Sequence, residues 1–212
     1  MDNLSNTLGI TSNKISELVK GSNHYIDAVE NVTREIKKTV ATLKGYAETE
    51  TPSLGQAVGS LASTFEIIEK ESTEKVKRLR EEYIAPLNDL LINLQKLQTE
   101  QNEARKATKE LEKAEKRLSK AQSKPKEKLK PNEIETAETE LKSAKEKSAK
   151  EESDVRVATE EFNKAKLETM QTILKKMVDI ETVFHKKILD SVATVKVKAE
   201  AIKIDDEAKI PQ

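Results

Sequence analysis

The side chains with the clearest chemical character lie between residues 101 and 131, where lysine and arginine outnumber glutamate. This stretch holds 11 basic and 5 acidic residues, a local net charge of +6. On a helical wheel at about 100° per residue, the basic residues of 105–120 fall within an arc of roughly 120°. Clustering of one sign predicts electrostatic binding of a polyanion. The candidate binding residues are Lys109, Lys113, Lys116, Arg117, Lys120, Lys124, Lys126, Lys128 and Lys130.

A basic face can also be the ordinary solvated surface of a coiled coil. Such surfaces usually mix both signs of charge, as residues 138–156 do, so we favour a binding surface for 101–131. Near an anionic membrane each Lys or Arg contributes about 1 kcal/mol, which makes acidic phospholipid a suitable partner. Nucleic acid is the other polyanion to consider. No aromatic residue lies among the lysines to stack on bases, so we do not expect nucleic acid as a partner.

Residues able to catalyse a reaction do not cluster in the sequence. His24 and His185 are the only histidines, and there is no cysteine to act as a nucleophile or a thiolate ligand. Carboxylates are numerous but dispersed, and neither a glycine-rich phosphate loop nor a metal-ligand spacing occurs. We therefore expect no enzyme activity, no cofactor and no bound metal.

The composition predicts which elements position the basic residues. Charged residues make up 36% of the 212 residues and aromatic residues only 3%. Apolar residues recur at spacings of three and four, which is typical of long helices and coiled coils, so the fold class is all-α. No apolar run is long enough to span a membrane, and the start of the chain lacks the basic and apolar segments of a signal peptide. These features favour a cytoplasmic protein that is peripheral on membranes.

Breaks in the apolar pattern divide the chain into three helices. Gly45 is a plausible helix stop, and Ser53 with Gln56 fits a capping box at the start of the next helix. Pro125 and Pro131 mark the second break. The predicted organisation is one domain of residues 1–205, with helices of about 8–45, 54–122 and 132–204, and a flexible tail of 206–212.

The size of the apolar residues changes along the second and third helices. They are large up to about residue 97 and mostly alanine from 104 to 121, and the third helix repeats this pattern in reverse. This predicts an antiparallel pair that is thin near the connecting turn and thick at the other end, where the first helix packs. Three helices supply too little apolar cover for the thick end, so we expect a homodimer with a shared bundle.

Pro86 lies inside the second helix, within the stretch "EEYIAPLNDLLINLQKL". Proline removes a backbone donor and clashes with the preceding turn, so it either kinks a helix or ends it. The apolar residues Tyr83, Leu87, Leu90 and Leu94 keep the same phase across it. We therefore expect a kink at Pro86 that contributes to curvature.

Several segments together resemble a BAR domain of the Bin/amphiphysin/Rvs family, of the short BAR-only type. They are "YIAPLNDLL", "EARKATKELEKAEKRLSK" and "FNKAKLETMQTILKKMVDIETVFHKKILDSV", in a chain whose helix order also fits. The resemblance implies three long kinked antiparallel helices that dimerise into a crescent-shaped six-helix bundle. It further implies a curved basic surface that binds acidic membranes.

The expected function is therefore that of a dimeric BAR module that senses or generates membrane curvature. Its expected partners are the acidic phospholipid membrane surface and a second copy of the chain, as an antiparallel homodimer. The resemblance also allows small GTPases or trafficking proteins as partners. The alternative is an elongated coiled-coil adaptor that binds proteins, including small GTPases, and has little affinity for lipid.

Overall fold

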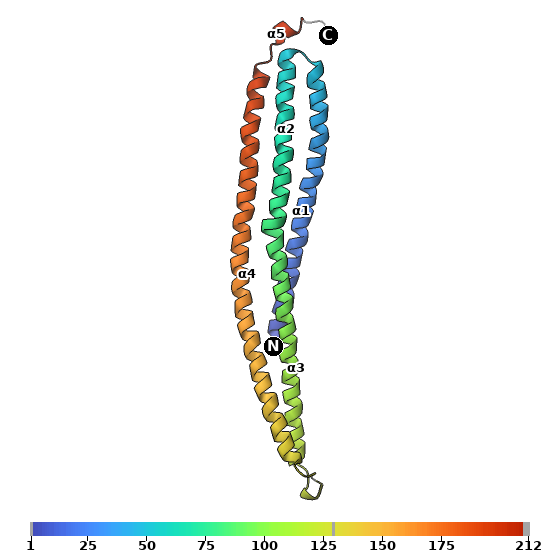
Figure 1. The fold of residues 1–212 in the computed structure, drawn as a ribbon, viewed down its shortest axis with the longest axis vertical. Coiled ribbons are helices and arrows are strands. Elements are labelled where there is room, and N and C mark those ends of the chain that lie inside the picture. Colours follow the sequence, from blue (N-terminus) through green and yellow to red (C-terminus); the bar gives the residue numbers. More distant parts are fainter. Residues whose placement is uncertain (1, 129, 210–212) are drawn as a thin grey trace. The chain divides into compact units, whose positions relative to one another are not determined.

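The computed structural model describes residues 2–128 and 130–209, except for the side chains of residues 2–6 and 126. Its elements are α1 (Asp2–Thr49), α2 (Pro52–Leu79), a π-helical turn η1 (Arg80–Ile84), α3 (Ala85–Gln122), a 3-10 turn η2 (Lys126–Lys128), α4 (Glu133–Glu200) and α5 (Ile204–Glu207). Because α2, η1 and α3 follow one another directly, they form the second of three long antiparallel helices (Figure 1). The predicted all-α fold is confirmed.

The chain divides into two compact units, each built from segments distant in sequence. The first unit comprises the residues up to Ser16 together with Asn88–Thr169. The second comprises Glu17–Leu87 together with the residues from Met170 onward.

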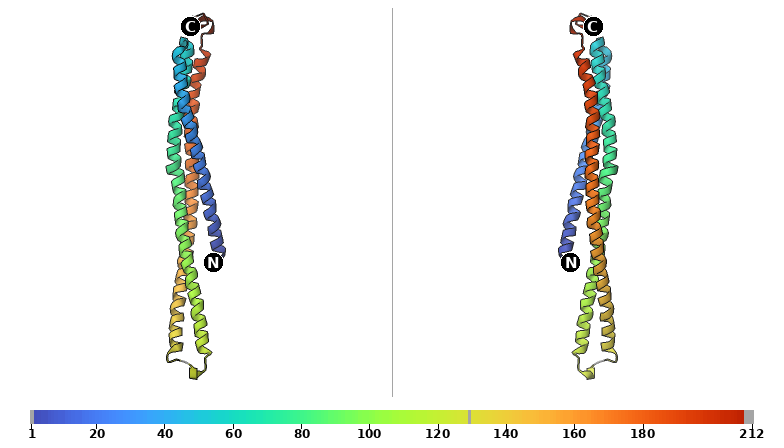
Figure 2. Two further views of the ribbon diagram at one scale, coloured as in Figure 1. Left: turned by 90° about the vertical axis from the view of Figure 1, so that its right-hand side faces the viewer. Right: turned by 90° about the vertical axis from the view of Figure 1, so that its left-hand side faces the viewer.

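In the first unit, α3 runs antiparallel to the first half of α4, and residues 123–132 connect them (Figure 2). Leu90, Leu94 and Leu97 are buried at one end of α3. Toward the connection the buried positions become alanine, because only small side chains allow two helices to pack closely. These positions are Ala104, Ala107, Ala114 and Ala121 on α3, with Ala137 on α4. The predicted change from large to small residues is confirmed.

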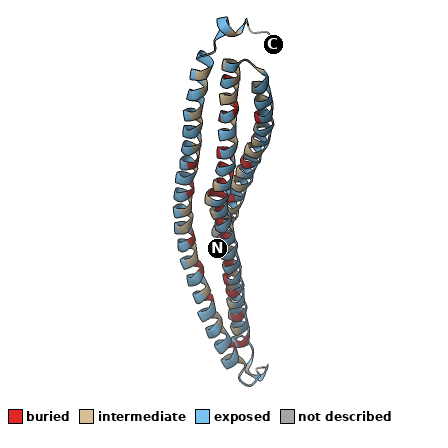
Figure 3. Ribbon diagram, turned by 45° about the horizontal axis from the view of Figure 1, so that its top comes forward, coloured by how far each residue is buried: buried red, intermediate tan, exposed pale blue. Residues whose placement is uncertain are grey.

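In the second unit, α1, α2, η1 and the second half of α4 pack around a core of larger side chains. The fully buried ones include Ile26, Leu79, Leu87, Ile173 and Ile180. Figure 3 shows that buried residues are sparse along the helices and lie among many exposed ones. A single chain therefore leaves much of each helix surface open to solvent.

The structure corrects the end point predicted for the first helix, and its buried face also differs from the heptad-like apolar stripe of Tyr25, Val29 and Val32 that the sequence predicts. Ile26 is buried, whereas Val32 is 58% exposed and Tyr25 is exposed. Ile15, Ile26 and Val40 are 11 and 14 residues apart, close to whole numbers of helical turns, so these three share the buried face. Helix α1 also continues through Gly45 to Thr49, because a helix tolerates an isolated glycine at a cost of about 1 kcal/mol.

Pro86 lies in the first turn of α3, directly after η1. The N–H of Ala85 bonds to the carbonyl of Arg80, five residues back, which is the spacing of a π-helix. The extra residue in this turn relieves the clash between a proline ring and the preceding turn. A kink at Pro86 stays a prediction.

The α1–α2 connection also differs from the predicted one. Helix α2 begins at Pro52, with Thr51 as its N-cap, rather than at a capping box of Ser53 and Gln56. Proline is favoured at the first helical position because its missing N–H would have no partner there. Gly55 lies close to the end of α1: a Cβ on this residue would lie 2.7 Å from the carbonyl oxygen of Ala47.

Replacement of Gly55 by alanine is expected to destabilise the protein. The added methyl group would displace the backbone of Ala47, which costs about 1–3 kcal/mol. Urea denaturation of Gly55→Ala measures this loss at fixed protein concentration. The matched control is Gly59→Ala, where a Cβ meets nothing within 4 Å and should stabilise helix α2 by up to about 1 kcal/mol. Equal midpoints for the two variants would contradict the proposed close approach.

A charged network lies inside the second unit. Lys75 is 6% exposed, and its ammonium lies 2.8 Å from Oε2 of Glu181 and 4.4 Å from the ring centroid of Phe184. The Tyr25 hydroxyl donates to Oε1 of Glu181 at 2.7 Å. Burial disfavours the charge of Lys75, but hydrogen bonds with Glu181 and Tyr25 outweigh it and raise the pKa of Lys75. The network thus joins α1, α2 and α4.

Glu82 of η1 joins a second network and provides a pH-dependent test of stability. It accepts from Nε of Arg78 at 2.6 Å and forms an ion pair with Lys176 at 3.0 Å. The Arg78 bond, followed by the Lys176 bond, lowers the pKa of Glu82 to about 2. Because this is below the unfolded value, the stabilisation is complete above about pH 5 and is lost as the pH falls toward 2.

Glu82→Gln is therefore expected to lower the free energy of unfolding at pH 7 and to have little effect near pH 2. Glu82 is 25% exposed, and solvent screening limits the loss to about 1 kcal/mol. Thermal melts from pH 2 to pH 7 measure it. The exposed neighbour Glu81 serves as the control, since Glu81→Gln should change stability by less than about 0.5 kcal/mol. A loss independent of pH would contradict this role for the Glu82 charge.

Candidate anion-binding surface

The predicted basic residues of α3 lie on its solvent face. Lys109, Lys113, Lys116 and Lys120 are all exposed. They lie opposite the alanine positions that pack against α4, because residues three, four and seven apart share one face of a helix. All of these residues belong to the first unit, so the structure brings this part of the predicted site together.

Two of the predicted basic residues form ion pairs with α4. Nη1 of Arg117 lies 2.6 Å from Oε2 of Glu140, and Nζ of Lys124 lies 2.5 Å from Oε1 of Glu133. The hydrogen bond from Lys124, together with one from the backbone N–H of Lys130, lowers the pKa of Glu133. Arg117 and Lys124 are therefore less available to an external anion than the sequence alone predicted.

The connection between α3 and α4 carries the remaining basic residues. Lys128 and Lys130 lie within this connection and are exposed. The side chain of Lys126 lies outside the described part of the structure. The prediction that these lysines bind an anion is not tested by their positions.

A further ion pair, which sequence reasoning missed like the two above, links α3 and α4 beside the exposed lysines. Nζ of Lys147 on α4 lies 2.9 Å from Oε2 of Glu110 on α3. The hydrogen bond from Lys147 lowers the pKa of Glu110, so this carboxylate stays charged close to Lys113. We use the name anion-binding surface for the candidate site formed by the six exposed lysines, Lys109, Lys113, Lys116, Lys120, Lys128 and Lys130.

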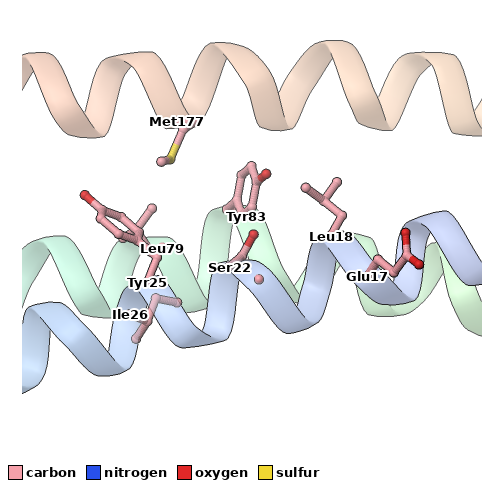
Figure 4. A pocket seen from close by; sticks show the side chains of 9 residues that line it. Glu17, Leu18, Ser22, Tyr25, Ile26, Leu79, Tyr83 and Met177 are labelled. Atoms are coloured by element: carbon pink, nitrogen blue, oxygen red, sulfur yellow. The ribbon is translucent and has the colours of Figure 1, made fainter.

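An apolar cavity lies in the second unit, away from these lysines in sequence. It measures about 270 Å³ and is lined by α1, α2, η1 and α4. Figure 4 shows Leu18, Tyr83 and Met177 directed into it from three of these elements. Its lining is mostly apolar, and the hydroxyl of Tyr25 at its edge is already bonded to Glu181.

The described residues contain no group of three or more side chains placed to hold a metal ion. None of the helices they form is both long and apolar enough to cross a bilayer. His24 and His185 are exposed, and Nε2 of His185 lies 3.5 Å from a carboxylate oxygen of Glu181.

The structure shows a second apolar stripe on α4, of which sequence reasoning had assigned only Val192 to an apolar face. On a helical wheel its four residues in the second unit fall within about 60°. They are Leu174, Val178, Leu189 and Val192, with exposures of 56%, 64%, 70% and 47%. This exposed stripe is distinct from the buried one that contains Ile173 and Ile180.

The fold is that of the BAR domains. The Drosophila amphiphysin BAR domain matches with a TM-score of 0.77 and 17% identity, over 99% of this chain and 94% of that chain. The I-BAR domain of D. Discoideum IBARa matches with a TM-score of 0.58 and 16% identity, over 98% and 90% of the two chains. The Hof1p F-BAR domain matches with a TM-score of 0.59 and 10% identity, over 98% and 89%.

Within this class, the sequence pattern of the FAM92 protein family matches residues 1–209. The chain therefore belongs to the FAM92 family. No curated protein matches it.

Proposed function

We propose that this chain is a peripheral membrane module, spanning residues 1–205, that dimerises and binds acidic phospholipid on the cytoplasmic side of a membrane. Its shape would then sense or generate curvature. The observation that supports this most directly is the exposed lysine cluster of the anion-binding surface, carried on a BAR fold. Catalysis, a cofactor and nucleic acid have no part in this proposal.

The number of lysines suits reversible membrane binding. Each contributes about 1 kcal/mol near an anionic leaflet, and the contribution decays within a Debye length of about 10 Å. Six lysines on one chain, some screened by neighbouring glutamates, give weak binding. Two chains joined in a dimer bind as a unit, so dimerisation raises the overall affinity without any new contact.

The exposed stripe of α4 supports the proposed dimer. Exposed leucine and valine side chains gathered on one helix face are unusual on a monomer and favour an interaction surface there. Each such side chain contributes about 1.5–3 kcal/mol when it is fully buried. In an antiparallel homodimer with two-fold symmetry, both subunits contribute the stripe to the interface. Each of its residues therefore contributes twice to the free energy of association.

Co-sedimentation with liposomes tests the proposed function. We expect the chain to sediment with vesicles that contain an acidic phospholipid and to remain in solution with vesicles of neutral lipid alone. Added salt should release it, because the lysine contribution is electrostatic. Failure to bind acidic vesicles at low salt would refute membrane binding.

The alternative function is an elongated adaptor that binds proteins, including small GTPases, rather than lipid. The ion pairs of Arg117 and Lys124 favour it, because they neutralise part of the basic surface. The equal numbers of basic and acidic residues, 38 of each, favour it too. Absence of binding in the liposome experiment would support this alternative.

A further inference from the structure

The N-terminus of helix α2 is capped by a residue from the far end of the sequence. Oε1 of Glu207 accepts a hydrogen bond from the backbone N–H of Ser53 at 2.9 Å, and its other oxygen accepts one from the hydroxyl of Thr51. The backbone N–H of Lys203 donates to Oγ of Ser53 at 3.0 Å. Figure 1 shows α5 beside the α1–α2 connection, where these bonds form. All four residues belong to the second unit.

This arrangement places an anion on a helix end that has no cap of its own. Thr51 occupies the N-cap position, but its side chain makes no capping bond to α2. Glu207 supplies the acceptor instead, and the bond from Thr51, with further bonds from Ser53 and Leu54, lowers the pKa of Glu207. The carboxylate is thus held charged at the positive end of the helix dipole.

Thr51 has the sequence context of a phosphorylation site. Of the five prolines in the chain, only Pro52 follows a serine or threonine. Thr51 also has an extended backbone, with φ of −60° and ψ of 155°, as a residue before proline favours. A threonine followed directly by proline is the sequence that proline-directed protein kinases recognise.

We propose that Thr51 is phosphorylated by a kinase of this class and that the phosphate displaces Glu207 from the N-terminus of α2. In the transfer, Oγ of Thr51 attacks the γ-phosphorus of ATP, and an Oγ–P bond forms. The bond from that phosphorus to the bridging oxygen of ADP breaks, and the hydroxyl proton passes to a base of the kinase. The products are phosphothreonine and ADP.

The displacement of Glu207 follows from the added negative charge and from the loss of its hydrogen-bond donors. Phosphorylation removes the hydroxyl proton that now bonds to Glu207 and adds a charge of about −2 next to its carboxylate. A phosphate at the N-cap can accept from the backbone N–H groups of Ser53 and Leu54, so α2 keeps a cap. Glu207 thus loses its hydrogen-bond donors Thr51, Ser53 and Leu54 and gains a repulsive neighbour, which releases the segment from residue 201 to residue 208. This inference is independent of lipid binding.

The test uses the full chain, a proline-directed kinase with ATP, and mass spectrometry before and after hydrogen exchange. We expect phosphate at Thr51 and none in a Thr51→Ala variant. In the phosphorylated chain the amides of Lys203, Glu207 and Ala208 should exchange at least about tenfold faster, while the amide of Gly55, bonded to the Thr51 carbonyl, stays protected. Full phosphorylation with unchanged exchange at these three amides would overturn the proposal.

Two substitutions of Thr51 distinguish the effect of an added charge from the effect of losing the hydroxyl. Thr51→Glu should accelerate exchange of the 203–208 amides more than Thr51→Ala does, since only the first adds a repulsive charge. Thr49→Glu is the matched control, because the Thr49 hydroxyl bonds to the carbonyl of Tyr46 and not to Glu207. If the kinase leaves Thr51 unmodified both in the native chain and in Glu207→Gln, where the competing charge is gone, the assignment of the site is wrong.

Discussion

Replacement of Lys109, Lys116 and Lys120 by glutamate is expected to weaken binding to acidic vesicles by on the order of 100-fold or more. Each substitution removes an attraction of about 1 kcal/mol and adds a repulsion of similar size. The three residues lie on the exposed face of α3, and none is a partner in the ion pairs with α4 described above. Liposome co-sedimentation over a range of acidic lipid contents measures the loss.

The same variant should keep its fold. Exposed lysines on a helix contribute little to packing, so the midpoint of its thermal melt should change by only a few degrees. The matched control reverses Lys142, Lys145 and Lys150, three exposed lysines of α4 in the same unit, within a stretch of mixed charge. It has the same net charge as the first variant. Equal loss of binding in both would show that total charge, and not this surface, determines affinity.

Arg117 is left out of the substituted set because its reversal would confuse two effects. Its guanidinium is paired with Glu140, so a glutamate at 117 would also bring two carboxylates together between α3 and α4. Like charges at such a distance destabilise the helix pair. A binding defect in that variant could therefore arise from a changed structure.

The fold could be predicted from the sequence largely because long helices have a strong local signal. Apolar spacing identified the second helix across Pro86, and the change from leucine to alanine identified where two helices approach closely. The face of α1 was predicted less well. Its apolar residues are few enough to fit several stripes, and only packing against α2 and α4 shows that Ile26 is buried while Val32 is exposed.

The candidate surface was predictable only in part, for a similar reason. The lysines of α3 form a dense local pattern that a helical wheel reveals. Their acidic partners come from α4, 23 residues away for Glu140 and Arg117, and no local pattern identifies such pairs. The cap of α2 shows the same limit: Glu207 lies 154 residues beyond Ser53, in a segment whose composition suggested a flexible tail.

Replacement of Val178 and Leu189 by glutamate is expected to abolish the proposed dimer. Both side chains are more than half exposed in the single chain, so the substitutions cost little in an isolated subunit. In a two-fold interface they would place four charges in apolar surroundings and remove about 1.5–3 kcal/mol for each side chain. We expect the dissociation constant to rise by roughly 1,000-fold or more.

Sedimentation velocity measures this directly, as a fall from twice the chain mass of 23.8 kDa to the chain mass itself. The control pair is Val157→Glu and Val197→Glu, two exposed valines of α4 that lie off the stripe on the helical wheel. A Val178 and Leu189 variant that remains dimeric would place the interface elsewhere.

Loss of the dimer should also reduce membrane binding although every lysine is intact. The monomer presents one anion-binding surface instead of two. It therefore lacks the high effective concentration at which a second surface would bind once the first is bound, and its overall affinity for the membrane is lower. Measuring the lysine variant and the monomeric variant on the same vesicles distinguishes the contribution of the lysines from that of dimerisation. If the monomeric variant bound as tightly as the native chain, a single surface would suffice, and the dimer would serve only to set the shape.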